Sequence, residues 1–152
     1  MANAARSPIA GIQENVHVTG RRILATILDG LVFGALYVVM AALFGTITIK
    51  GFLYWQADLS TLPSVVYGVL VILYYILLEG YLGQTLGKML LGIKVVREDT
   101  GEVPGLKAAT IRTLLRIIDG LFSYLVAFVA VLVSSKRQRL GDMAAHTLVA
   151  RK

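Results

Sequence analysis

The amino-acid sequence predicts an all-α polytopic membrane protein with three membrane-embedded apolar helical segments and a small cytoplasmic element that resembles a β-hairpin. Of its 152 residues, 57% are hydrophobic and 16% are charged, whereas soluble domains hold about 45–50% apolar and about 25% charged residues. Three apolar runs cover residues 23–44, 65–82 and 114–133 approximately. Each is close to the roughly 20 helical residues that cross a hydrocarbon core about 30 Å thick. We therefore expect a polar tail, residues 1–20, followed by one membrane domain, residues 21–152.

The first apolar segment is expected to be an uncleaved anchor. Arg21-Arg22 resembles the start of a signal peptide. The apolar run that follows is longer than the usual 7–15 residues of such a peptide, and it contains Asp29. A helix that stays in the membrane fits this pattern better than a segment that is removed.

The positions of basic residues orient the first two segments. Arg6, Arg21 and Arg22 precede the first segment, whereas the loop of residues 45–64 contains only Lys50. Five basic residues follow the second segment: Lys88, Lys94, Arg97, Lys107 and Arg112. Because cytoplasmic loops carry the excess of Lys and Arg, we expect the N-terminus and residues 83–112 in the cytoplasm and the 45–64 loop outside. Tyr54 and Trp55 in that loop suit the outer membrane–water interface.

The cytoplasmic region after the second segment carries strand and turn signals. Residues 93–97 alternate apolar and basic, and Asp99-Thr100-Gly101 is a turn signal followed by Glu102-Val103. We expect a small hairpin here, to which residues 147–150 could add a strand. Pro104-Gly105 then breaks the chain before a helix that begins near residue 106.

The third segment allows two topologies, because basic residues flank it on both sides. A straight span would leave the C-terminus outside, and a re-entrant hairpin would keep it in the cytoplasm. Residues 84–89 (QTLGKM) recur as residues 138–143 (QRLGDM), with Lys88 and Asp142 at equivalent positions. Two similar motifs most simply lie on the same face of the membrane, which favours a cytoplasmic C-terminus, although the straight span is the simpler geometry.

A second repeat places charged residues inside the apolar segments. Arg22 stands seven residues before Asp29, and Arg112 stands seven residues before Asp119, with Gly-Leu after each aspartate. Seven residues are almost two helical turns, so each pair projects from one helix face. Charged side chains at membrane depth are costly unless they are paired or solvated. We therefore expect one polar cluster formed by Arg22, Asp29, Glu79, Arg112, Arg116 and Asp119.

Three interpretations of this cluster remain open. It can be a set of buried ion pairs that fixes helix packing. It can be a cation or proton site, in which a carboxylate alternates between a counter-ion arginine and a bound cation. It can also support a surface that docks on another membrane protein. Two GxxxG motifs, Gly30 with Gly34 and Gly83 with Gly87, predict close helix packing and a route to homo-oligomers.

Several other functions are excluded by what the sequence lacks. It has no cysteine, and its two histidines, His17 and His146, stand far apart, so we expect no metal site. Residues 83–89 lack the first glycine and the Ser or Thr of a phosphate loop, and no catalytic motif is present elsewhere, so we expect neither an enzyme nor a cofactor. The net charge of +6 lies beside apolar segments rather than in a basic stripe with aromatics, which argues against nucleic acid.

These landmarks resemble the RDD family of bacterial membrane proteins, named for one arginine and two aspartates. Arg22, Asp29 and Asp119 stand where those three belong, and residues 83–96 and 136–142 are also similar. The resemblance covers about residues 20–150. One departure is His146-Thr147, where such proteins often have Gly-Thr.

The resemblance implies a multi-pass protein of the bacterial inner membrane, in contact with the bilayer and without nucleic acid. It further suggests ion or solute transport, or an accessory role beside a partner protein. We expect either an oligomeric transporter that uses the Arg/Asp cluster, or an accessory subunit in which the cluster is structural.

Overall fold

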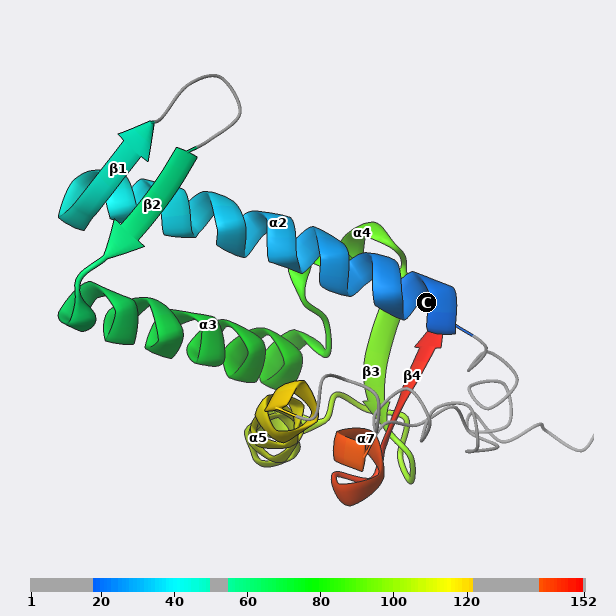
Figure 1. Ribbon diagram of the computed structural model, residues 1–152. Coiled ribbons are helices and arrows are strands. Elements are labelled where there is room, and N and C mark those ends of the chain that lie inside the picture. Colours follow the sequence, from blue (N-terminus) through cyan, green and yellow to red (C-terminus); the bar gives the residue numbers. More distant parts are fainter. Residues whose placement is uncertain (1–17, 50–54, 122–139, 152) are drawn as a thin grey trace, which may run out of the picture.

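The computed structural model describes residues 18–49, 55–121 and 140–151 (Figure 1), without the side chains of residues 118–121 and 140. Two long helices, α2 (Thr19–Phe44) and α3 (Thr61–Leu82), run side by side in opposite directions. Within the described residues, these two helices are long and apolar enough to cross a membrane. They correspond to the first two predicted segments and begin about four residues earlier. Of the third predicted segment, residues 114–121 form the end of helix α5 (Gly105–Leu121), and the rest, residues 122–133, lies outside the described residues.

The surfaces of α2 and α3 are those of helices that face lipid. Large apolar side chains remain exposed along both, among them Leu31, Leu43, Leu62 and Val65, each more than half exposed. Within the span windows, 17% of residues are buried in α2 and none in α3. Such a continuous apolar surface is unfavourable in water and suited to a bilayer.

Aromatic side chains fill the space between α2 and α3. The ring of Phe33 lies 4.9 Å from that of Tyr74 and 5.5 Å from that of Tyr75, both in edge-on geometry. Tyr37 and Tyr67 form a third edge-on pair at 5.3 Å. The Tyr67 hydroxyl also donates to the Phe33 carbonyl at 3.1 Å, which fixes the helices in register.

A hairpin that we did not predict joins the two long helices at one end. Strands β1 (Gly45–Ile49) and β2 (Trp55–Leu59) pair antiparallel, Gly45 opposite Leu59 and Ile49 opposite Trp55. Both strands are largely exposed, which is why no burial pattern in the sequence marked them.

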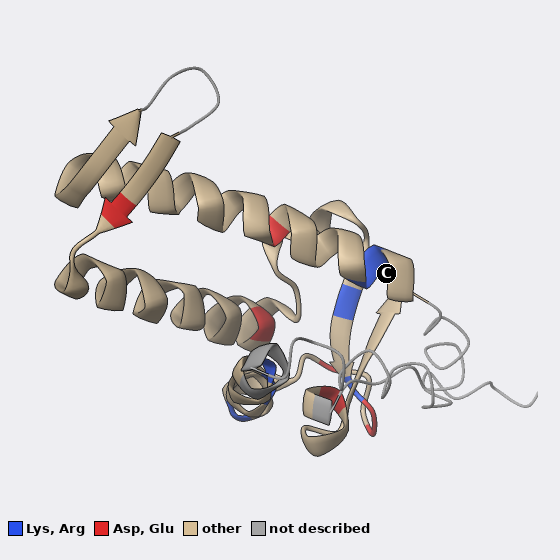
Figure 2. Ribbon diagram, in the orientation of Figure 1, with Lys and Arg blue, Asp and Glu red and all other residues tan. Residues whose placement is uncertain are grey.

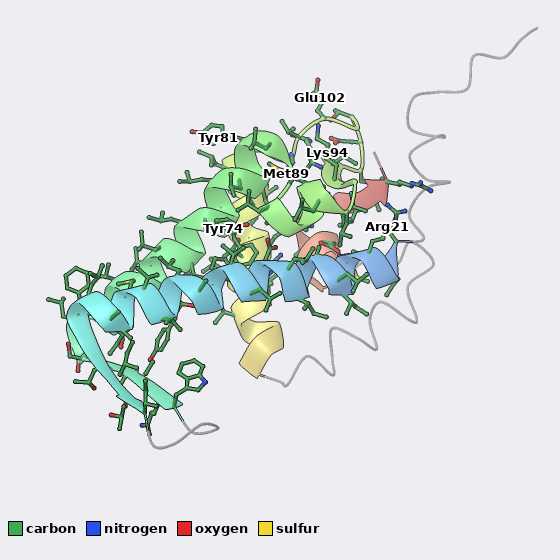
Figure 3. All side chains as sticks on the ribbon, turned by 90° about the horizontal axis from the view of Figure 1, so that it is seen from above. Arg21, Tyr74, Tyr81, Met89, Lys94 and Glu102 are labelled. Carbon is green, nitrogen blue, oxygen red and sulfur yellow. The ribbon has the colours of Figure 1, made fainter. Side chains whose placement is uncertain are left out.

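The remaining elements gather at the opposite end, where α2 begins and α3 ends (Figure 1). They are α4 (Leu86–Leu90), β3 (Ile93–Arg97), α5 (Gly105–Leu121), α7 (Leu140–Ala144) and β4 (Thr147–Arg151). Helix α5 packs on α3 and runs crosswise to the long helices in both views (Figures 1 and 3). The two repeated motifs, in α4 and α7, therefore lie at the same end of the molecule.

The predicted strand at residues 93–97 and the strand added by residues 147–150 are confirmed, but the predicted local hairpin with residues 102–103 is wrong. Strand β3 pairs antiparallel with β4, Ile93 opposite Arg151 and Arg97 opposite Thr147. Residues 102–103 form no strand, although the Arg97 amide donates to the Glu102 carbonyl at 2.9 Å. The reason is burial: four of five residues in β4 are buried, whereas residues 102–103 are exposed. Tertiary packing thus selects the distant partner over the local one.

A small hydrophobic core lies between this two-stranded sheet and the first turns of α2. It consists of Val18, Ala25, Ile93, Val95 and Val149. Gly83 connects α3 to this core with φ +67°, and a Cβ there would lie 2.5 Å from the Val95 carbonyl oxygen. Glycine is therefore required at the point where α3 ends and the chain turns toward the sheet.

Candidate functional site

Seven buried or partly buried charged residues meet at the end of the molecule that holds the sheet. We call them the charge cluster: Arg22, Asp29, Glu79, Lys88, Arg112, Arg116 and Asp142. They come from five helices, α2, α3, α4, α5 and α7. Figure 2 shows that charged residues concentrate at this end, while the long helices carry few. The cluster therefore ties the spans to the short elements.

Glu79 is the most heavily paired carboxylate of the charge cluster. It is fully buried and lies in the last turn of α3. It accepts hydrogen bonds from Lys88 Nζ at 2.5 Å, from Arg112 Nε at 3.0 Å and from Arg116 Nη2 at 3.0 Å. The Arg116 guanidinium also lies 3.9 Å from the centre of the Tyr75 ring, a cation–π contact that adds to its ion pair.

Arg112 links Glu79 to the second carboxylate, Asp142. Its Nη1 donates to Asp142 and, at 2.6 Å, to the Thr147 hydroxyl. Arg22 from α2 also donates to Asp142. These ion pairs hold the first turn of α2, the middle of α5 and the α7–β4 connection together.

Asp29 differs from the other two carboxylates because its partners are neutral. It is 2% exposed and accepts hydrogen bonds from the Tyr74 hydroxyl at 2.9 Å, the Thr85 hydroxyl at 2.7 Å and the Gly87 amide at 2.8 Å. Within the described residues it forms no ion pair. Asp29 thus fastens α3 and the start of α4 to α2 without a cation.

The predicted packing glycines have different surroundings. A Cβ at Gly87 would lie 2.3 Å from the Ala25 carbonyl oxygen, so glycine allows α4 to approach the backbone of α2. Gly83 ends α3, as described above. Gly30 and Gly34 face open space, with nothing within 4 Å of an added Cβ. Their predicted packing role therefore has no counterpart within the described chain.

The structure brings together most of the predicted site residues and adds others. Arg22, Asp29, Glu79, Arg112 and Arg116 meet as expected. Asp119 lies in α5, but its side chain is outside the described residues. Lys88 and Asp142, which we had assigned only to a cytoplasmic motif, belong to the charge cluster. The sequence did contain a signal for them, because two similar motifs carry opposite charges at equivalent positions.

Three hydroxyl groups of the site were missed by sequence reasoning. They belong to Tyr74, Thr85 and Thr147, of which Thr85 and Thr147 are fully buried. Hydroxyl side chains are common in apolar segments and in helix caps, and Thr85 also caps α4 by accepting from the Lys88 amide. Nothing in their spacing distinguishes them from residues without such partners.

A small cavity of about 20 Å³ opens within the charge cluster. Its lining residues are Arg22, Thr26, Asp29, Lys88, Arg112, Arg116, Gly141 and Asp142. This volume suffices for one water molecule, which needs at least about 10–15 Å³ and two or more polar partners. The cavity can therefore hold a single small polar occupant beside Asp29.

The described members of the charge cluster carry a small excess of positive charge. Four cationic side chains face three carboxylates, and burial lowers the pKa of Lys88 to about 8 despite its contact with Glu79. Repulsion by Arg112 and Arg116 acts in the same direction as burial. Lys88 is therefore the cation of the cluster that is most easily deprotonated.

Comparison with known proteins gives one family and two relatives. The model of the RDD family matches residues 17–146. Proline-rich antigen homologs from two strains of Mycobacterium tuberculosis, CDC 1551 / Oshkosh and ATCC 25618 / H37Rv, are each 36% identical over 70 residues. That match covers 46% of this chain and 29% of each relative, so the chain spans less than a third of their length. No solved structure gives a significant match.

Proposed function

The chain belongs to the RDD family of membrane proteins, and we propose that it transports an ion or a small solute across the bacterial inner membrane, with Asp29 as the exchangeable carboxylate. The environment of Asp29 carries the proposal. Glu79 has three cationic partners and Asp142 has two, whereas Asp29 has only neutral donors in the described chain. A carboxylate without a bound cation can accept a proton or another small cation without first breaking an ion pair.

The cavity beside Asp29 supplies a place for the transported species or for a water that carries a proton. It holds one small occupant and is also lined by Arg22, Lys88 and Arg116. Because these cations repel a second positive charge, an occupant next to Asp29 is bound weakly. Weak binding suits a site that must release its occupant on the other side.

Hydrogen bonds to Asp29 offer a way to couple occupancy to movement. The carboxylate holds the Gly87 amide and the Thr85 hydroxyl, so it fastens α4 to α2. Protonation or cation binding removes negative charge from the acceptor and weakens both bonds. The α4 segment would then be released from α2, which opens the cavity toward the cytoplasmic end.

A transport route requires more helices than the two described spans, or the three predicted segments, of one chain provide. We propose that copies of the chain associate, and that Gly30 and Gly34 form part of the contact. Both glycines face open space on α2, and small residues four apart allow a second helix to approach closely. The positive-inside rule places the N-terminus and the charge cluster at the cytoplasmic side.

Flux through liposomes tests the transport function. The purified protein is reconstituted, and proton and Na⁺ or K⁺ movement is followed with entrapped dyes under imposed gradients. Asp29→Asn is expected to abolish flux, while Asp58→Asn, the same change at an exposed site in β2, should leave it unchanged. Tyr74→Phe removes one donor to Asp29 and retains the carboxylate, so it should alter the rate without abolishing flux.

The controls make each outcome informative. Circular dichroism and gel filtration first establish that Asp29→Asn keeps its helix content and its oligomeric state. Flux that persists in this folded variant contradicts the role of Asp29. The absence of flux in the wild type under every gradient contradicts transport.

A second candidate function is an accessory subunit that docks on a partner membrane protein. The ion pairs of Glu79 and Asp142 with arginine and lysine support this accessory function, because they hold five helices in one arrangement. In that case the pure protein transports nothing, and Asp29→Asn lowers the yield of a partner co-purified from native membranes.

A further inference from the structure

We propose that a second cleft, separate from the charge cluster, binds the phosphate group of an anionic phospholipid. The cleft has a volume of about 370 Å³ and lies between the start of α5 and the turn from α7 to β4. Its lining residues are Arg97, Pro104, Lys107, Ala108, Ile111, Ala144, Ala145 and His146. The volume is within the range of small-molecule sites, about 300–1,000 Å³.

The polar lining of this cleft attracts anions. Arg97, Lys107 and His146 all offer hydrogen-bond donors to an anion, and no carboxylate is among the described lining residues. In the described part of the chain Lys107 makes no ion pair. Arg97 pairs with Asp99 at 2.7 Å and also interacts with the charge of Glu102, but the side chains of the pair are about half exposed, so water screens it and a phosphate can compete for the guanidinium.

His146 occupies a backbone position that favours glycine. Its φ is +49°, and it is the non-glycine residue with positive φ in the described chain. Glycine adopts this conformation without strain, whereas a side chain here costs stability. A strained residue that lines a cleft is a candidate for function, because its side chain supplies something that the fold itself does not require.

Exposed apolar side chains stand next to the lining residues in the sequence. Val103 and Met143 are each 37% exposed and directly precede Pro104 and Ala144. The cleft lies at the end of the span pair that holds the sheet, where α5 runs crosswise (Figures 1 and 3). Tyr81 and Met89, both labelled in Figure 3, are 65% and 38% exposed.

These features favour a lipid over a free phosphate compound. A soluble anion needs only the basic residues, whereas the cleft lies at one end of the two candidate spans, where lipid headgroups are concentrated. Basic pockets at the cytoplasmic side of membrane proteins bind anionic headgroups in this way, with about 1 kcal/mol for each Lys or Arg. The lipid class is therefore one with a net negative phosphodiester headgroup, such as phosphatidylglycerol.

Native mass spectrometry of the full chain in detergent tests the proposal. The protein is titrated with phosphatidylglycerol, with phosphatidylcholine and with inorganic phosphate. We expect adducts of phosphatidylglycerol at concentrations where phosphatidylcholine gives few. Lys107→Gln should weaken the binding of phosphatidylglycerol about fivefold. The double variant, Arg97→Gln combined with Lys107→Gln, should weaken it about 25-fold. Asp99→Asn frees Arg97 and should strengthen binding.

Two variants separate a specific site from general attraction. Lys94→Gln removes the same charge from β3 outside the cleft lining and should leave binding unchanged. His146→Gly relieves the backbone strain, so it should weaken lipid binding while the melting temperature stays equal or rises. Equal adducts with phosphatidylcholine, equal loss in Lys94→Gln, or displacement of the lipid by inorganic phosphate would each overturn the proposal.

Discussion

Replacement of Glu79 by glutamine tests whether the charge cluster holds the molecule together. Glu79 is fully buried and contacts three cations at 2.5–3.0 Å. After Glu79→Gln, Arg112 retains Asp142, but Lys88 and Arg116 lose their carboxylate within the described chain. Removal of one partner from a buried pair costs about 3–5 kcal/mol, because a charge is left without compensation. We expect a loss of this size in the free energy of unfolding.

The matched control is Asp99→Asn, the same acid-to-amide change in an exposed pair. Arg97 and Asp99 are 49% and 57% exposed, and water screens such a pair, so its loss should cost far less than the loss of Glu79. Each purified variant is unfolded at equilibrium in mixed micelles by titration with sodium dodecyl sulfate, and far-ultraviolet circular dichroism follows the loss of helix. The two titrations give the change in unfolding free energy for Glu79→Gln and for Asp99→Asn.

A double variant identifies the cause of the loss. Glu79→Gln combined with Lys88→Met removes the carboxylate and the cation that it leaves unpaired. We expect a coupling free energy of about 0.5–3 kcal/mol in favour of the double variant. The reasoning is refuted if Glu79→Gln costs no more than Asp99→Asn, since Glu79 would then not compensate buried cations.

Three further predictions concern packing, pH and topology. Gly87→Ala places a methyl group 2.3 Å from the backbone of α2 and should lower the unfolding free energy by about 1–3 kcal/mol. Gly20→Ala is the control, because an added Cβ at Gly20 meets no described atom within 4 Å, and it should leave the unfolding free energy unchanged. Because the pKa of Lys88 falls from 10.5 to about 8 on folding, the unfolded chain binds more protons between these pH values, and unfolding free energy should rise with pH there by up to about 3 kcal/mol. Lys88→Met should lack this rise, and an equal slope in both proteins would contradict the burial of a charged lysine. In this cysteine-free chain, an impermeant thiol reagent applied to intact cells should label Asp58→Cys but not Asp99→Cys, and the reverse result would invert the proposed orientation.

Much of the charge cluster could be predicted because membrane insertion makes buried charge rare. Asp29, Glu79 and Arg116 are conspicuous within apolar runs, Arg22 stands directly before one, and helical periodicity indicates that Arg22 and Asp29 share a face. Lys88 and Asp142 lie outside those runs, where charged residues are ordinary. Only the folding of α4 and α7 back onto the ends of the spans reveals that they complete the cluster.

The sequence by itself determined the class of the protein, the two spans that the structure describes and the family, because these depend on local composition and on short motifs. The tertiary structure alone decided that β3 pairs with β4 rather than with residues 102–103, that Asp29 has neutral hydrogen-bond donors, and that Gly30 has no close neighbour among the described residues. Each of these depends on which distant segments bury one another. Strand pairing and hydrogen bonding follow that burial, and local pattern carries no information about it.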